Sequence, residues 1–140
     1  MRVNIKTNAK KVEKALKQKG KDVKQSLKRA LSITAQQGIN IIEARTEDGV
    51  GYKGGAFKGY SEKYAKFRGA KGRGKNVDLQ FTGRMLGSMT SKADNKKAKI
   101  FFTRAEEAKK AAMNNKTRPF FGFNRKEEKQ LAKTFFRYIK

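Results

Sequence analysis

The chain has 140 residues, with 36 lysines and arginines against 12 aspartates and glutamates, so its formal net charge is +24 at pH 7. It contains no cysteine and no histidine, which excludes disulfides, thiolate chemistry, the common zinc modules and the commonest general base. The charge predicts association with nucleic acid, an acidic protein surface or anionic lipid, although a lysine-rich surface that mainly confers solubility fits it equally well. No signal peptide and no membrane-spanning stretch is recognisable, so we expect one soluble domain over residues 1–140 that is made and used without export.

The N-terminal third predicts a short strand followed by a long helix. Residues 2–6 alternate between apolar and polar side chains, as a strand does. Asn8 is a candidate N-cap for an amphipathic helix that runs to about Arg45, and Gly20 predicts a bend within it. The apolar side chains recur at spacings near three and four, which places them on one helical face; they are Val12, Leu16, Val23, Leu27, Leu31, Thr34, Ile41 and Ile42. The repeat is too irregular to favour a coiled coil.

Residues 46–76 predict an extended loop region rich in glycine and lysine. Glycines crowd two segments, 49–59 and 69–74, and long loops in a small domain are usually functional or flexible. Neither segment matches a P-loop, which needs Gly-Lys-Ser/Thr at the start of a helix. Residues 72–75 instead resemble a flexible basic arm that could touch a nucleic-acid backbone, and a mobile surface loop is an equally good interpretation.

A short helix is expected inside this loop region. Ser61 is a good N-cap for a helix over residues 62–67. Tyr60, Tyr64 and Phe67 then gather on one side of it. We expect these rings to pack onto the domain rather than to stack on bases, because no alternating aromatic strand of the RNA-binding kind is present.

A short helical turn and a β-hairpin are predicted next. Thr82 is a strong N-cap for a turn over residues 83–88. Residues 88–93 and 97–103 read as two strands joined by a turn at 94–96.

The C-terminal part predicts two further helices. The first covers residues 104–113 and ends at Asn114-Asn115. Pro119, the only proline, forces Arg118 towards an extended conformation and starts a turn. Asn124 caps a final helix to about Ile139, whose apolar residues at helical spacing are Leu131, Phe135 and Tyr138. Helices mixed with a hairpin, without βαβ alternation, predict an α+β fold in which a long N-terminal helix and a C-terminal helix pack on a small antiparallel sheet.

Catalytic chemistry finds little support in the sequence. The pair Glu106-Glu107 and the pair Glu127-Glu128 both fall in the first turn of a predicted helix, where the helix dipole favours them without any catalytic role. Spacing gives no support for a two-metal nuclease site built from Glu47, Asp48 and Asp78. We therefore predict that the chain is not an enzyme and uses no metal, cofactor or small-molecule substrate.

The ordered motifs of the chain resemble those of a known family. A long helix ending in Ala44-Arg45-Thr46 is followed by aromatic, Thr-Gly and Arg-Pro-Phe motifs, whose positions are Phe57, Tyr60, Ser61, Tyr64, Leu79, Thr82, Gly83, Leu86, Ser88, Arg118, Pro119, Phe120 and Gly122. In this order they resemble the virion morphogenesis or tail-completion family of tailed bacteriophages, whose members are neck and head–tail joining proteins. The resemblance covers nearly the whole chain. The Ala- and Lys-rich segment 104–115 departs from it.

The resemblance implies an α+β subunit of a homo-oligomeric ring at the virion neck, assembled in the host cytoplasm and bound to other neck, portal-adaptor or tail proteins. It implies that Thr82 caps the short helix and positions Leu86 in the core. It also implies that Pro119 and Phe120 fix the turn before the last helix, and that Phe57 and Tyr60 hold the glycine loop.

The high charge is not something the family pattern requires. It could face DNA or acidic neighbours, and the candidate contact residues are Lys53, Lys58, Arg68, Lys71, Arg73 and Lys75. The alternative interpretation is a lysine-rich nucleic-acid-binding module without sequence preference, which explains the charge but not the ordered motifs.

Overall fold

The computed structural model describes residues 2–6, 20–74, 76–80 and 82–139, which form two compact units. The sheet unit contains residues 2–41, 90–101 and 124–139. The loop unit contains Ile42–Met89 and Phe102–Phe123. Helix α2 (Lys21–Glu47) contributes residues to each unit. The class is α+β, as predicted.

The sheet has three strands in the order β1-β3-β2. β1 (Val3–Lys6) pairs antiparallel with β3 (Lys97–Phe102), and Val3 lies opposite Ile100. β2 (Met89–Ala93) and β3 form the predicted hairpin.

The hairpin turn is closed by Asp94. Its carboxylate accepts hydrogen bonds from the backbone amides of Lys96 at 2.7 Å and Lys97 at 2.8 Å. These two bonds lower the pKa of Asp94. The positive charges of Arg2, just before β1, and of Lys97 lower the pKa of Lys99 on β3, so like charges lie close together where these two strands pair.

Helix α2 begins at Lys21, directly after Gly20, which has φ +66. A left-handed residue of this kind cannot continue a helix, and glycine adopts it at little cost. The predicted bend is therefore a helix start. The expected cap at Asn8, and the apolar positions Val12 and Leu16, lie outside the described residues.

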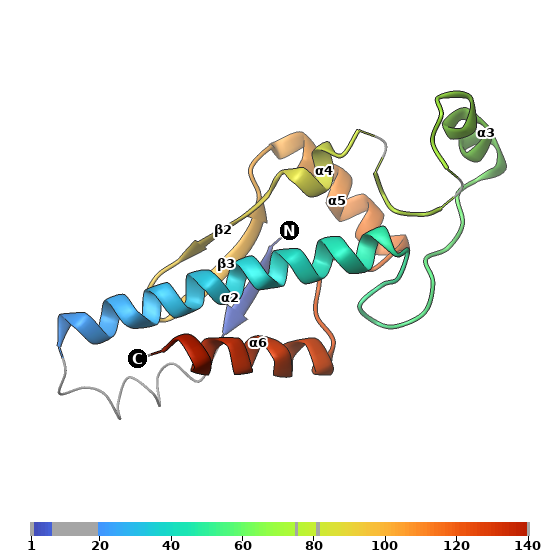
Figure 1. The fold of residues 1–140 in the computed structure, drawn as a ribbon. Helices are drawn as coiled ribbons and strands as arrows, with labels where there is room; N and C mark the ends of the chain where they lie inside the picture. Colours follow the sequence, from blue (N-terminus) through green and yellow to red (C-terminus); the bar gives the residue numbers. More distant parts are fainter. Residues whose placement is uncertain (1, 7–19, 75, 81, 140) are drawn as a thin grey trace. The chain divides into compact units, whose positions relative to one another are not determined.

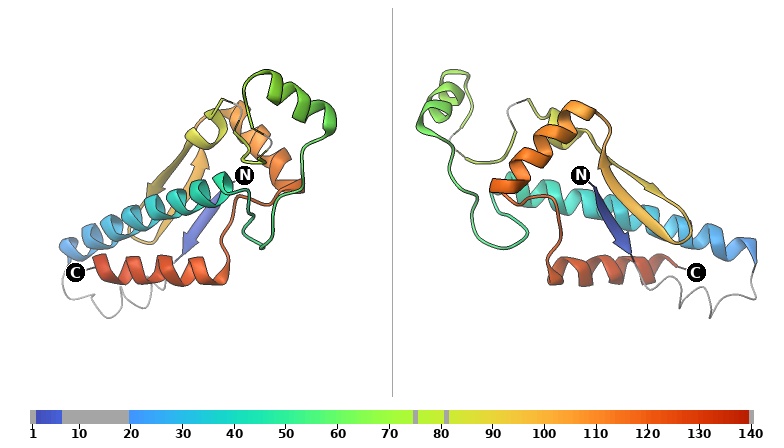
Figure 2. Two further views of the ribbon diagram at one scale, coloured as in Figure 1. Left: turned by 45° about the vertical axis from the view of Figure 1, so that its right-hand side comes forward. Right: turned by 180° about the vertical axis from the view of Figure 1, so that it is seen from behind.

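In the sheet unit, α2 runs along one face of the sheet (Figures 1 and 2). The buried side chains of this unit come from α2, β3 and α6; they include Val23, Leu27, Ala30, Leu31, Thr34, Ala35, Ile39, Ala98, Ile100, Leu131 and Phe135. Thr34 satisfies its buried hydroxyl by donating a hydrogen bond to the carbonyl of Ala30 at 2.7 Å. The helical spacing seen in the sequence thus identified Val23, Leu27, Leu31 and Thr34 correctly, whereas Ile41, expected on the same face, is only half-buried.

Helix α6 (Arg125–Tyr138) is capped by Asn124, as predicted, and the cap is a complete capping box with Glu127. The Asn124 side chain accepts from the Glu127 amide at 2.8 Å, and the Glu127 carboxylate accepts from the Asn124 amide at 3.0 Å. Tyr138, expected on the apolar face, is 40% exposed in the last turn.

The loop unit holds α3 (Glu62–Ala70), α4 (Arg84–Gly87) and α5 (Ala105–Thr117). Helix α5 runs past Asn114-Asn115, so the predicted end is wrong. The side-chain amides of Asn114 and Asn115 both form hydrogen bonds within the helical conformation, so neither ends the helix. The Asn114 side chain donates to the Lys110 carbonyl at 2.9 Å, and the Asn115 side chain accepts from the Phe121 amide at 3.0 Å. The helix ends instead before Pro119, where Arg118 is extended at φ −126 and ψ 90, as predicted.

The first glycine segment is a tight, hydrogen-bonded turn rather than a loose loop. Val50 and Ala56 form a bridge, and the buried Phe57 donates its amide to the Gly49 carbonyl at 2.8 Å. A Cβ at Gly51 would lie 2.8 Å from the Pro119 carbonyl oxygen, so the two backbone segments approach as closely as only glycine permits.

Candidate functional site

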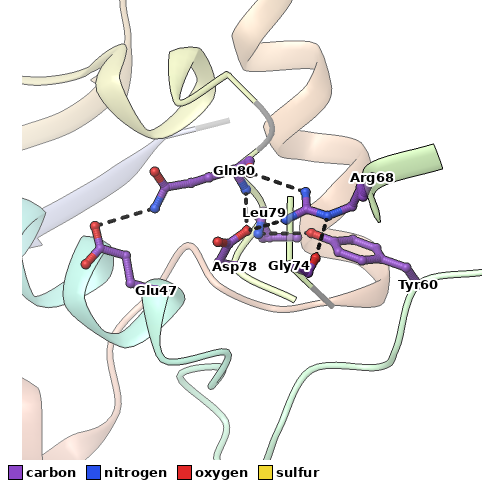
Figure 3. Close-up of polar contacts among 7 residues, drawn as sticks. All are labelled: Glu47, Tyr60, Arg68, Gly74, Asp78, Leu79 and Gln80. Carbon is purple, nitrogen blue, oxygen red and sulfur yellow. Dashed lines mark hydrogen bonds and ion pairs between the residues drawn. The ribbon is translucent and has the colours of Figure 1, made fainter. Parts of the chain in front are cut away.

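Arg68 on α3 is a buried arginine of the loop unit, with a relative exposure of 2%. Its guanidinium donates to the carbonyls of Gly74 at 3.3 Å and Gln80 at 3.2 Å, and it pairs with the Asp78 carboxylate at 3.2 Å (Figure 3). A buried arginine requires such partners to offset its lost hydration. The sequence-based assignment of Arg68 as a DNA or acidic-partner contact is therefore wrong, because its charge points into the unit.

Tyr60 lies against this guanidinium and against a second one. The ring centroid is 4.8 Å from Cζ of Arg68 and 4.9 Å from Cζ of Arg118, both within cation–π range. The phenol oxygen accepts a hydrogen bond from the backbone amide of Leu79 at 3.1 Å. Burial raises the pKa of Tyr60, so its hydroxyl is neutral at physiological pH.

Leu79 has φ +57, a left-handed conformation that costs a non-glycine residue about 1–2 kcal/mol. Two hydrogen bonds enclose it. One is the bond from its own amide to Tyr60, and the other runs from the Gln80 amide to the Asp78 carboxylate at 3.0 Å. The same carboxylate that pairs with Arg68 thus also fixes the backbone on the far side of Leu79.

Arg118 ties a distant motif to this cluster. Its guanidinium donates to the carbonyl of Lys58 at 2.7 Å and to the carbonyl of Gly59 at 3.0 Å. The arginine of the Arg-Pro-Phe motif is therefore hydrogen-bonded to the backbone just before Tyr60, although about sixty positions separate the two segments in the sequence. We call the group formed by Tyr60, Arg68, Asp78, Leu79 and Arg118 the clasp.

A second arginine holds the residues after Pro119. Arg45, near the end of α2, donates to the carbonyls of Phe120 at 2.7 Å and Gly122 at 2.9 Å. The rings of Phe120 and Phe121 are buried in this turn. A Cβ at Gly122 would lie 2.7 Å from the ring of Tyr52, so this turn also packs against the first glycine segment.

The Thr-Gly motif is arranged differently from the prediction. The N-cap of α4 is Gly83 at φ +79, and Thr82 is exposed, accepting from the Arg84 amide at 3.3 Å. The capping role assigned to Thr82 is therefore wrong, because the chain turns through the left-handed glycine instead. Leu86 is buried, as predicted, and the buried Ser88 donates its hydroxyl to the Met85 carbonyl at 2.9 Å.

The predicted grouping of rings on α3 is confirmed, but their packing onto the domain is not. Ser61 caps the helix by accepting from the Tyr64 amide at 3.2 Å. Tyr60 and Tyr64 meet edge to face at 4.9 Å, and Tyr64 stacks with Phe67 at 6.2 Å. Tyr64 and Phe67 nevertheless remain 37% and 47% exposed, because Arg68 occupies the inner side of the helix in their place.

A cavity of about 560 Å³ adjoins the clasp. Its wall includes Tyr60, Arg118 and the buried carboxylate of Glu107, which pairs with Lys110 at 3.4 Å. The carboxylate pairs with a neighbouring ammonium group, and the Arg118 guanidinium is engaged by the carbonyls of Lys58 and Gly59 and by the ring of Tyr60, so the charged groups of the wall already have partners within the protein.

Two of the three acidic residues considered as metal ligands contact other side chains. Asp78 pairs with Arg68, and the Glu47 carboxylate accepts from the Gln80 side chain at 3.5 Å (Figure 3). Over the residues that the structure describes, no three metal-ligating side chains come together. Within the same residues, no helix is long and apolar enough to cross a membrane.

The remaining basic candidates are distributed over the loop unit. Lys53, Lys58, Lys71 and Arg73 are exposed, and Lys75 lies outside the described residues. Sequence reasoning missed Asp78 as the partner of Arg68. The signal that could have revealed it is a carboxylate ten positions after an arginine that follows two tyrosines at helical spacing, Tyr60 and Tyr64.

Comparisons of the chain with protein-family models, with curated proteins and with solved structures find no match. The evidence for function is therefore the geometry of the clasp together with the order of the motifs.

Proposed function

We propose that this chain is a structural protein of a tailed-bacteriophage virion, and that it forms a homo-oligomeric ring at the neck, where it joins the DNA-filled head to the tail or completes the tail. The observation that carries the proposal is the convergence of motifs in the clasp. The segment around Tyr60, the segment around Leu79 and the motif beginning at Arg118 are far apart in the sequence and meet in one unit.

The contacts of these motif residues support a structural role. Arg118 uses its guanidinium on two backbone carbonyls and one ring, and Tyr60 uses its hydroxyl on a backbone amide. A catalytic residue would instead present its reactive atom to a substrate within hydrogen-bond reach. The motifs thus fix loop geometry, which is what a subunit of a fixed ring requires. The proposed role involves no enzymatic activity and no cofactor.

The net charge of +24 sets the conditions under which such a ring should form. Like charges on neighbouring copies repel, and salt screens this repulsion over about 10 Å at 0.1 M. We therefore expect the ring to be favoured by moderate salt or by an acidic neighbour.

The test is the oligomeric state of the purified chain. We expect light scattering and averaged electron images to show a closed ring with rotational symmetry at 0.15–0.5 M salt. Arg118→Ala should reduce ring formation because the loop unit loses its grip on the segment at Tyr60, whereas Arg125→Ala, at an exposed position on α6, should leave it unchanged.

Labelling of phage particles with a specific antibody tests the location. Label at the head–tail junction is expected. A protein that stays monomeric at all concentrations and salt levels, or label confined to other parts of the particle, would refute the proposal.

The charge favours one second candidate, a nucleic-acid-binding module without sequence preference. A well-folded monomer whose DNA affinity falls steeply with salt, and which forms no ring, would support this candidate over the first.

A further inference from the structure

The outer face of α3 combines exposed aromatic rings with lysines. Tyr64 and Phe67 are 37% and 47% exposed, and their rings lie 6.2 Å apart at an interplanar angle of 28°. Large rings exposed side by side on a helix surface usually mark an interaction site.

The rings are held on a fixed base. Arg68, the residue next to Phe67, is anchored by its bonds to Asp78 and to two carbonyls, and Ser61 caps the start of the helix. A binding partner would therefore meet pre-positioned rings and would lose little affinity to the ordering of flexible side chains.

Lysines surround the exposed rings. Lys63 lies four residues before Phe67 and Lys71, the C-cap of α3, lies four residues after it, so both neighbour Phe67, and Lys66 lies three residues after Lys63 and neighbours that lysine. All three are exposed. The acidic residue of α3, Glu62, lies in the first turn, at the opposite end of the helix from Lys71.

We propose that this α3 face, made of Lys63, Tyr64, Lys66, Phe67 and Lys71, binds single-stranded nucleic acid. One ligand of this class supplies both phosphates for the lysines and unpaired bases for the rings, and aromatic stacking with a positively charged groove is the usual mode of sequence-independent single-strand binding. A duplex hides its base faces and would engage the lysines alone. A second copy of a chain with charge +24 would bring like charge to a basic surface. This inference goes beyond the proposed ring and does not depend on it.

The probe is a fluorescent 20-nucleotide oligo-dT strand, compared with a duplex of equal length by anisotropy in 50–300 mM KCl. The native chain should bind the single strand more tightly. Phe67→Ala should weaken single-strand binding about 5- to 150-fold, the usual effect of removing one stacking ring, while duplex binding changes less than about twofold. Phe67→Tyr, which keeps an aromatic ring, should bind the single strand like the native chain. Phe67→Leu, which keeps the bulk without the aromatic ring, should bind it as weakly as Phe67→Ala.

The matched control is Phe136→Ala on α6. Phe136 is 52% exposed, also contacts a neighbouring ring, at 5.3 Å, and lies beside Arg137 on a helix rich in lysine. The Phe136→Ala variant should bind the single strand and the duplex with the affinities of the native chain.

The lysines are tested in the same way. Lys63→Gln with Lys66→Gln should lower the salt slope of single-strand binding by about 1.4, because each phosphate contact contributes about 0.7. The pair Lys24→Gln with Lys28→Gln removes equal charge from α2, where both residues are exposed, and should lower the slope less.

Equal effects of Phe67→Ala and Phe136→Ala would overturn the inference, as would duplex binding as tight as single-strand binding. If Phe67→Ala instead changes the oligomeric mass and leaves DNA binding intact, the face is a contact between copies and the inference is wrong. The two proposals can fail separately. A chain that binds single-stranded DNA at this face but forms no oligomeric ring would refute only the proposed function, and a chain that forms the oligomeric ring but does not bind single-stranded DNA would refute only this inference.

Discussion

Replacement of Arg68 with alanine is the sharpest test of the clasp. The substitution removes a side chain that is 2% exposed; it leaves two carbonyls without this donor and the Asp78 carboxylate without its cation, although Asp78 keeps the bond from the Gln80 amide. Breaking a buried ion pair by removing one partner costs about 3–5 kcal/mol. The Asp78 side chain is 30% exposed, so water can solvate part of its charge, and we expect a loss near the lower end, about 3 kcal/mol. That is a large part of the 5–15 kcal/mol that stabilises a typical domain.

Urea denaturation followed by circular dichroism measures this loss, and amide exchange of α3 shows whether it is local or global. Arg68→Lys keeps the charge but cannot donate in three directions from a planar fork, so its loss should be intermediate. Lys66→Ala, at an exposed position two residues away, should change stability by less than about 0.5 kcal/mol. An Arg68→Ala protein with native denaturation and native exchange in α3 would refute the idea that the clasp holds this helix.

Three further substitutions test single contacts. Gly51→Ala should cost about 1–3 kcal/mol of stability in thermal unfolding followed by circular dichroism, because the new methyl group meets a backbone carbonyl at 2.8 Å. Gly59→Ala, which has open space around it, should be nearly neutral in the same measurement. Tyr60→Phe should cost about 1–3 kcal/mol at pH 7, because the Leu79 amide loses its acceptor. Since burial raises the pKa of Tyr60, the native chain should lose this advantage as pH rises above about 10, and a difference between the two proteins that stays constant to pH 11 would contradict the assignment. Thr82→Ala should change the melting temperature little, and a loss near 1 kcal/mol would restore the capping role that the structure denies.

Much of the architecture could be predicted because local rules decide it. Asn124 and Glu127 form a capping box that is recognisable from their spacing, and Asp94 closes a turn that its residue type favours. The apolar spacing of Leu27 and Leu31 marks the buried side of α2. The capping box and the Asp94 turn join residues within a few positions, and the burial of Leu27 and Leu31 follows a periodicity that is itself local, so a short sequence window contains each signal.

The clasp could not be predicted because its partners are distant. Arg118 and Lys58 lie 60 positions apart, and nothing local says that their backbones meet. Thr82 is a good N-cap by type, but Gly83 adopts a left-handed conformation that moves the cap by one residue. Sequence reasoning places Arg68 at the surface because arginines usually lie there, and only the three-dimensional structure shows that it is buried and paired with Asp78.

The clasp also joins the two ends of the segment between Tyr60 and Gln80 by non-covalent bonds. Tyr60 accepts from the Leu79 amide, and Arg68 bonds to Asp78 and to the Gln80 carbonyl. Lys71 and Arg73 are exposed within this segment, while Arg68 and Asp78 stand on either side. A trypsin cut at Lys71 or Arg73 should therefore yield two peptides on a denaturing gel that still travel as one particle in native buffer. The backbone of this segment can be severed, yet its ends stay together because side chains, rather than the covalent chain, hold them.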